Sequence, residues 1–293
     1  MLLQHQLLII SRPLQLMLRK ICCKLGVVSP NRLRVLLYHD IQEDQEESFY
    51  EQLNWLKREW NFVTPDQFEK MILGEMPIKG SNLLLTFDDG MLSNLAIAEN
   101  ILNKLDIKAI FFVISEFIKI KDTFKVKQFV SKYILDGFNI NNCPKTWSNL
   151  QSTDLKKLIK QGHTIGSHTK THKRLSNCNS KSELEEEIII SAKNIELILG
   201  IEIKHFAYTF GDIDSFSKDA LLIAKSKFSF IYSGLRGDNS KLTSPFAIRR
   251  DAASIQSPVE YKILNNKLLG AFLDGFSDFH YKSSRKKIDF WTK

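Results

Sequence analysis

The sequence lacks the features that mark a membrane-spanning or secreted chain. No apolar stretch reaches the ~18 residues that a transmembrane helix needs. The first residues carry neither the basic start nor the small-residue cleavage site of a signal peptide. The four cysteines form no Cys-x-x-Cys pair, and Cys22 and Cys23, being adjacent, are poor disulfide partners for each other. We therefore expect reduced thiols and a cytosolic compartment.

Internal repeats, low-complexity tracts and basic motifs interleaved with aromatic residues are also missing. The last absence argues against nucleic acid as a partner, because the lysines are scattered along the chain. The 41 Lys and Arg nevertheless exceed the 33 Asp and Glu, and the resulting charge of +8 favours anionic surfaces or phosphate-bearing substrates. At 293 residues and 43% hydrophobic content, the chain can bury a sizeable core and has the length of a single α/β barrel.

Short apolar runs alternate with helical patterns along most of the chain. Strands are predicted near residues 35, 83, 109, 164, 205, 228 and 247. This alternation of strand and helix is typical of a parallel α/β fold. The last of these strands is expected over Phe246–Arg250. Residues 115–150 are the least regular stretch, and we expect an insertion with helices that borders the substrate cleft.

Both ends of the chain are predicted to lie outside the barrel. Residues 1–30 form an N-terminal extension in which a basic amphipathic helix begins after Ser11-Arg12-Pro13, a helix-start signal. This helix, over residues 13–25, either packs on the outside of the barrel or anchors the protein at a membrane surface, and the pattern favours neither. Residues 31–273 are expected to form the barrel, and residues 274–293 a basic surface tail.

The strand near residue 83 ends in two adjacent carboxylates. The apolar run is followed directly by Asp88, Asp89 and Gly90. Neighbouring side chains on an extended chain point to opposite sides, so the two carboxylates are not expected to share one role. A turn at Gly90 would still let both border one pocket at the carboxyl end of a parallel strand, where α/β proteins keep their chemistry. An ordinary Asp-Asp-Gly turn is the alternative.

Two histidines four residues apart follow further along the chain. Three of the seven histidines fall within Gly162–His172, and His168 and His172 can hold one divalent metal from a helix face or from a loop. One carboxylate and two imidazoles leave coordination positions open, which is typical of a catalytic metal site. The alternative is a chance cluster of surface or core histidines.

The two motifs together resemble a known family. Thr86-Phe87-Asp88-Asp89-Gly90 and His168-Thr169-Lys170-Thr171-His172 are similar to the first two motifs of the polysaccharide deacetylases with a NodB homology domain, the carbohydrate esterase family 4 type. The words Phe206–Gly211 and Leu36–His39 also resemble that family, the second of them a subset that carries Tyr-His on the first strand. The resemblance covers residues 33–253 and implies an α/β fold, a distorted (β/α)7 barrel.

The resemblance implies a role for each matching residue. Asp88 is the expected general base and His39 the expected general acid, with His280 as the poorer match for the acid. One divalent metal ion is expected, with Zn²⁺ first and Co²⁺, Ni²⁺ or Mn²⁺ as alternatives, and its ligands are Asp89, His168 and His172.

The remaining expected site residues concern the substrate. The backbone N–H of Tyr208 is the expected oxyanion donor, and Phe210 and Arg250 are expected beside it. The arginine that tethers the catalytic Asp in many relatives is missing before Phe206, so Arg249 or Arg250 is expected to replace it. The other strand histidines, His163 and His205, are expected to be structural.

The implied activity is removal of an N-acetyl group from an amino sugar in a polysaccharide, glycolipid or sugar precursor, with a metal ion as cofactor. One alternative is a barrel of the same descent that binds glycan without turnover, which the intact set of motif residues disfavours. The other is an amidase or deformylase acting on a nucleotide-linked sugar. The expected partners are the N-acetylated carbohydrate and, through residues 13–25, a membrane surface. The expected location is cytoplasmic, with peripheral attachment at the inner face of the membrane as a variant.

Overall fold

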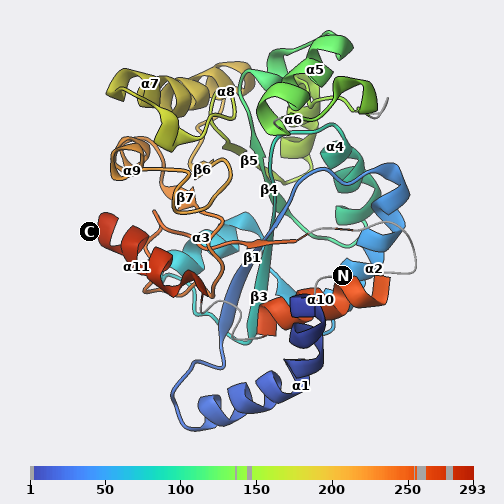
Figure 1. Cartoon of the computed structure of the whole chain (residues 1–293), viewed down its shortest axis with the longest axis vertical. Coiled ribbons are helices and arrows are strands. Elements are labelled where there is room, and N and C mark those ends of the chain that lie inside the picture. The colour runs from blue at the N-terminus through green and yellow to red at the C-terminus, as the bar shows by residue number, and fades with distance from the viewer. Residues whose placement is uncertain (1–2, 136, 144–146, 254, 256–261, 275–279) are drawn as a thin grey trace.

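A curled sheet of parallel strands forms the centre of the molecule (Figure 1). The structure is a computed structural model that describes residues 3–135, 137–143, 147–253, 255, 262–274 and 280–293. Along the sheet the strand order is β7-β6-β5-β4-β3-β1-β8, and a short β2 also pairs with β3. The strands are β1 (Arg32–Tyr38), β2 (Asn61–Phe62), β3 (Ser81–Phe87), β4 (Ala109–Val113), β5 (Thr164–Ser167), β6 (His205–Ala207), β7 (Phe230–Tyr232) and β8 (Asp251–Ala252). The predicted parallel α/β fold is confirmed, and the curled half-barrel is consistent with the expected distorted (β/α)7 barrel.

Apolar side chains cover both faces of this sheet, which is why its strands appear as continuous apolar runs. Leu84 and Phe112 point into the barrel, whereas Leu85 and Phe111 point outward against the helices. The outer layer consists of α2 (Glu46–Leu56), α4 (Ser93–Ile97), α6 (Ser152–Lys160), α7 (Lys181–Glu185), α8 (Ser191–Leu199) and α9 (Lys218–Lys225). Helix α3 (Pro65–Leu73) instead packs Phe68, Met71 and Ile72 against the inward-facing side chains. The 115–150 stretch contains α5 (Thr123–Phe129) and a π-helical turn over Val130–Ile134, as an insertion with helices predicts.

The register of β1 on β3 aligns the ends of the two strands. They pair in parallel from Arg32↔Ser81 to Tyr38↔Phe87. The next residue continues this ladder, because the Asp88 N–H donates to the carbonyl of Tyr38 at 2.9 Å. The residues that follow β1 and β3 therefore emerge together at the carboxyl end of the sheet.

The last predicted strand is placed differently from expectation. Phe246–Arg250 does not form a strand; Ile248 makes an isolated bridge to Tyr232, and strand β8 follows at Asp251–Ala252. Asp251 then pairs with Leu36 of β1. The chain pairs with β7 at Ile248 and with β1 from Asp251, three residues later, so each of these two strand pairings is short. The same segment thereby links the two edges of the sheet.

The N-terminal helix begins earlier than predicted. Helix α1 spans Leu3–Lys24 and includes Pro13, which the sequence placed at its start. The helix packs alongside α10 (Lys262–Asp274), and this contact offsets the backbone hydrogen bond that proline cannot donate. The sequence left open packing on the barrel or anchoring at a membrane, and in the structure the helix lies against α10. Among the described residues no helix is long and apolar enough to cross a membrane, and all four cysteines are free.

The C-terminal residues, predicted as a basic surface tail, include a helix. Residues 282–291 fold into α11 (Lys282–Trp291), whose Ile288 is buried. The Trp291 ring meets Phe216 edge-on, with centroids 6.1 Å apart. The basic side chains are spread over a helix with one apolar face, and burial of that face holds the end of the chain on the barrel.

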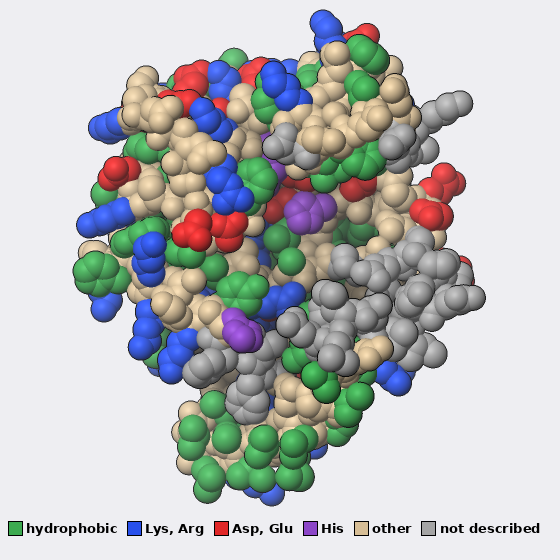
Figure 2. Space-filling model, in the orientation of Figure 1, with side chains coloured by type: hydrophobic (Ala, Val, Ile, Leu, Met, Phe, Trp, Pro, Cys, Tyr) green, Lys and Arg blue, Asp and Glu red, His purple; other side chains and the backbone are tan. Residues whose placement is uncertain are grey.

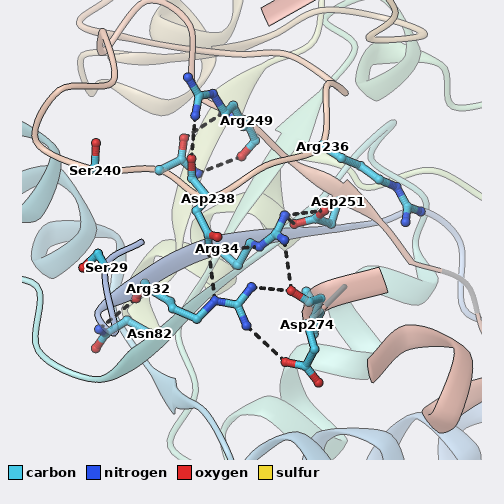
Figure 3. Close-up of polar contacts among 12 residues, drawn as sticks. Ser29, Arg32, Arg34, Asn82, Arg236, Asp238, Ser240, Arg249, Asp251 and Asp274 are labelled. Atoms are coloured by element: carbon cyan, nitrogen blue, oxygen red, sulfur yellow. Dashed lines mark hydrogen bonds and ion pairs between the residues drawn. The ribbon is translucent and has the colours of Figure 1, made fainter. Parts of the chain in front are cut away.

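Buried ion pairs fasten the amino-terminal end of β1 (Figure 3). Arg34, which is fully buried, lies 3.1 Å from Asp251 of β8 and 3.1 Å from Asp238. Arg32 pairs with the same Asp238 at 3.2 Å and with Asp274 of α10 at 3.1 Å. Arg32 and Arg34 of β1 thus hold β8, the loop that contains Asp238, and α10 against the amino-terminal end of the sheet.

Candidate active site

The two adjacent aspartates reach the same cavity because the chain turns sharply at the second one. Asp88 follows the alternation of Leu84 and Thr86 and points into the barrel, and it is buried. Asp89 would point away on an extended chain, but its φ of 75° places it in the left-handed region. Gly90 follows with a φ of 86°. These two turn residues redirect the Asp89 carboxylate toward the cavity, so Asp88 and Asp89 border the same site although they approach it from different directions.

The two histidines lie on a loop, not on a helix. His168 follows β5 and continues the inward alternation of Gly166. The chain then reverses through positive φ values of 64° at both Thr169 and His172. The His172 N–H donates to the Thr169 hydroxyl at 3.0 Å, which holds the turn closed. The spacing of four therefore brings both imidazoles together through a tight loop.

Asp89, His168 and His172 form a group that can hold a metal ion, and these three residues are called the metal group below. Asp89 Oδ1 lies 3.6 Å from His168 Nε2 and 3.4 Å from His172 Nε2. Their ligand atoms all lie within 4.8 Å of one another, and all three side chains are buried. Asp89 Oδ1 has no hydrogen-bond partner among the described residues, although it is inaccessible to solvent. A buried, unpartnered carboxylate oxygen facing two imidazole nitrogens fits a divalent cation.

Backbone carbonyls set the tautomer of both histidines. The Nδ1–H of His168 donates to Ala207 at 2.9 Å, and that of His172 donates to Tyr133 at 2.6 Å. Each ring therefore turns an unprotonated Nε2 toward Asp89, the arrangement that second-shell acceptors impose on metal-binding histidines. Burial lowers the pKa of His168 to about 4, so this ring is neutral at neutral pH, as a ligand must be.

Arg250 binds the other carboxylate. Its guanidinium makes two hydrogen bonds to Asp88, from Nη1 to Oδ1 at 2.7 Å and from Nη2 to Oδ2 at 2.9 Å, and both side chains are buried. Burial alone would raise the pKa of Asp88, but Arg250 and the nearby His168 outweigh it and hold that pKa below its usual value. Arg250, and not Arg249, is therefore the tether. Arg249 points elsewhere and pairs with Asp289 at 3.2 Å.

The sequence model of the polysaccharide deacetylase family matches residues 76–227, which include both motifs. The chain belongs to the polysaccharide deacetylase family. No curated protein matches the chain. Solved structures with the same fold include IcaB from Ammonifex degensii, with 21% identity and a TM-score of 0.63 over 84% of this chain and 98% of that one.

Two further neighbours agree on the fold. The Streptococcus pyogenes deacetylase PplD, solved in complex with acetate, has 20% identity and a TM-score of 0.61 over 80% of this chain and 98% of its own. A de-N-acetylase from Aggregatibacter actinomycetemcomitans has 17% identity and a TM-score of 0.59 over 80% of this chain and all of its own. At identities this low, the structural matches show a shared fold alone.

The residues expected to handle the substrate are only partly where the resemblance places them. His39 is exposed at the cavity mouth, and its carbonyl accepts a hydrogen bond from Asn94 at 3.0 Å. The Tyr208 N–H donates to the carbonyl of Tyr232 at 3.1 Å, continuing the β6–β7 ladder. That N–H is not free to bind an oxyanion, so this prediction is wrong. Phe210 lines the cavity and packs on the His172 ring at 4.9 Å.

His163, His205 and His280 lie outside the candidate site. The His163 Nδ1 accepts the Ala109 N–H at 3.2 Å. His205 pairs with Glu69 at 3.1 Å. His280, the second choice for the general acid, precedes α11 and is absent from the described cavity lining.

The cavity above the metal group has a volume of about 350 Å³ and walls that are largely apolar. The insertion supplies Val130, Ile134, Leu135 and Trp147 to these walls. The Trp147 Nε1–H donates to Asp40 at 2.9 Å, which fixes the ring at the mouth. Sequence reasoning placed the insertion beside the cleft but missed Trp147 and Asp40. Asp40, directly after His39, was the one available signal.

Removing Arg250 should destabilise the protein strongly, because it leaves the Asp88 carboxylate buried without a partner. For Arg250→Met we expect a loss of about 3–5 kcal/mol in the free energy of unfolding, measured by urea denaturation. Adding Asp88→Asn to that variant should restore part of the loss, since the charge is then gone. The control is Arg174→Met, which breaks an exposed pair with Asp212 (3.1 Å) and should cost less than about 1 kcal/mol. Equal losses for the two single variants would contradict a special role for Arg250.

Proposed function

We propose that this polysaccharide deacetylase is a metal-dependent hydrolase that removes the N-acetyl group from an amino sugar within a glycan. The observation that carries the proposal is the position of Asp88 beside the Asp89–His168–His172 group, with Asp88 Oδ2 3.7 Å from His168 Nε2. A base next to a metal group is what hydrolysis of an unactivated amide requires. Two structural neighbours support the choice of bond, because one is a de-N-acetylase and the other was solved with acetate.

Asp89, His168 and His172 would hold the ion. Nitrogen and oxygen ligands in this number favour Zn²⁺, with Co²⁺, Ni²⁺ and Mn²⁺ as alternatives. When bound, such an ion makes water acidic near neutral pH and polarises a carbonyl group.

Asp88 accepts the proton of the attacking water in this proposal. Its two bonds to Arg250 keep it ionised and fix its direction, so it is ready as a base at the bottom of the cavity. His39 extends from the adjacent strand β1 at the cavity mouth, which suits protonation of the leaving amine. Trp147 and Phe210 offer ring faces to the sugar.

The alternatives raised by the sequence have less support. A glycan-binding barrel without turnover would have no need to keep the Asp88–Arg250 pair and the orphaned Asp89 oxygen together. A deformylase on a nucleotide-linked sugar would use the same groups. Acetate release from N-acetylated oligosaccharides, compared with formate release from formylated nucleotide sugars, tests this choice directly.

The two aspartates should separate in a metal assay. Asp89→Asn and His172→Ala should lose stoichiometric divalent metal, measured by mass spectrometry of purified protein, because each removes one of three ligands. Asp88→Asn should keep the metal and lose at least about 10²-fold in acetate release, the usual contribution of a general base. His280→Ala is the control and should retain both properties. If Asp88→Asn lost its metal and Asp89→Asn kept it, the two roles would be reversed.

Removal of His39 should affect turnover without affecting the metal. We expect His39→Ala to lower kcat by about 10²–10⁴, because the leaving amine then lacks its acid. Near-wild-type turnover would assign the acid to another residue, and loss of metal would make His39 a ligand.

A further inference from the structure

Helix α1 carries an exposed apolar stripe along its outward face. Six residues of the helix at helical spacing and Leu25 directly after it form the stripe, with exposed fractions from 40% at Leu18 to 74% at Ile10: Leu7, Ile10, Leu14, Met17, Leu18, Ile21 and Leu25. The stripe makes the green patch at the bottom of the space-filling view (Figure 2). Single exposed leucines are ordinary on a protein surface, whereas a contiguous apolar patch of this kind marks a binding surface.

Contacts on the other side of α1 hold the stripe outward. Arg12 binds Asp274 of α10 at 2.7 Å and Glu59 at 3.1 Å. Its guanidinium passes over Gly270, where an added Cβ would lie only 2.8 Å from Arg12 Cζ. About two turns later, Arg19 lies 3.7 Å from Asp238. These ion pairs fix the rotation of the helix, so the stripe cannot turn in to cover itself on the barrel.

Charge identifies what covers the stripe. The first 39 residues contain no Asp or Glu. The exposed Lys20 and Lys24 lie along one border of the stripe and form no ion pair within the described part of the chain. A second copy of this helix would bring apolar residues but no acidic group for these lysines. A surface with anionic groups on the outside and an apolar layer beneath them can bind both the apolar stripe and the two lysines.

We propose that α1 binds an anionic membrane surface, lying in the interface with its apolar stripe among the upper acyl chains. The helix lies near the amino-terminal end of β1, whereas His39 follows the carboxyl end of that strand (Figure 1). Binding through the stripe therefore leaves the cavity mouth open to water. The proposal concerns attachment alone and does not depend on the activity proposed above.

The test uses the full chain and vesicles of phosphatidylcholine with and without phosphatidylglycerol, in a co-sedimentation assay. The wild type should bind the anionic vesicles at low salt and dissociate as salt rises. The stripe variant Leu14→Gln/Met17→Gln/Ile21→Gln should bind at least about tenfold more weakly. Replacing Lys20 and Lys24 by Gln should weaken binding by about fivefold for each lysine and flatten the salt dependence.

A matched control carries three exposed leucines from other surfaces, Leu197→Gln/Leu222→Gln/Leu242→Gln, and should bind as the wild type does. Far-ultraviolet circular dichroism and urea unfolding show that each variant is folded. Wild-type protein that ignores anionic vesicles at low salt overturns the proposal, as does a folded stripe variant that still binds. Sedimentation equilibrium measures the oligomeric state of the wild type and of the stripe variant. A wild-type dimer that the stripe substitutions dissociate would assign the stripe to a second copy of this chain.

Discussion

The ion pair between Asp88 and Arg250 is the interaction on which the site depends. It joins residues 162 positions apart and buries both charges. Arg250 belongs to the segment that passes from β7 to β1, and the next residue, Asp251, makes the buried pair with Arg34 at 3.1 Å. Two successive residues thus neutralise a charge inside the barrel and a charge at its base. The segment that joins the two edges of the sheet thus also carries the ion-pair partner of the proposed base.

Backbone strain is concentrated where the ligands need it. Five non-glycine residues of the described chain have positive φ. Three of them lie in the loops that carry the metal group: Asp89, Thr169 and His172. Such conformations cost of order 1 kcal/mol each and persist only where surrounding contacts over-determine them. Here the Asp88 N–H on the Tyr38 carbonyl and the His172 N–H on the Thr169 hydroxyl fix the two turns. The cost is offset by a preformed group that needs no rearrangement to accept an ion.

The sequence was informative where chemistry and local pattern coincide. The apolar run ending in Asp88-Asp89-Gly90 and the pair His168 and His172 could be placed on strand ends, because alternation and turn residues are local properties. Nothing local distinguishes Arg249 from Arg250, since the choice depends on which one faces the barrel after the chain changes strands. The Tyr208 N–H was assigned by resemblance, and a ladder bond to Tyr232 overrode it. The early start of α1 depends on α10, hundreds of residues away.

The insertion and the metal group form one physical unit. The π-helical turn Val130–Ile134 contributes Val130 and Ile134 to the cavity wall, and its Tyr133 carbonyl accepts the Nδ1–H of His172. Any movement that reshapes the wall for a different sugar also moves the acceptor that orients this ligand. Trp147 extends the link to the mouth, because its ring is held by Asp40, the neighbour of His39. Residues of the 115–150 stretch thus form part of the cavity wall, accept the Nδ1–H of His172 and bind Asp40 beside His39.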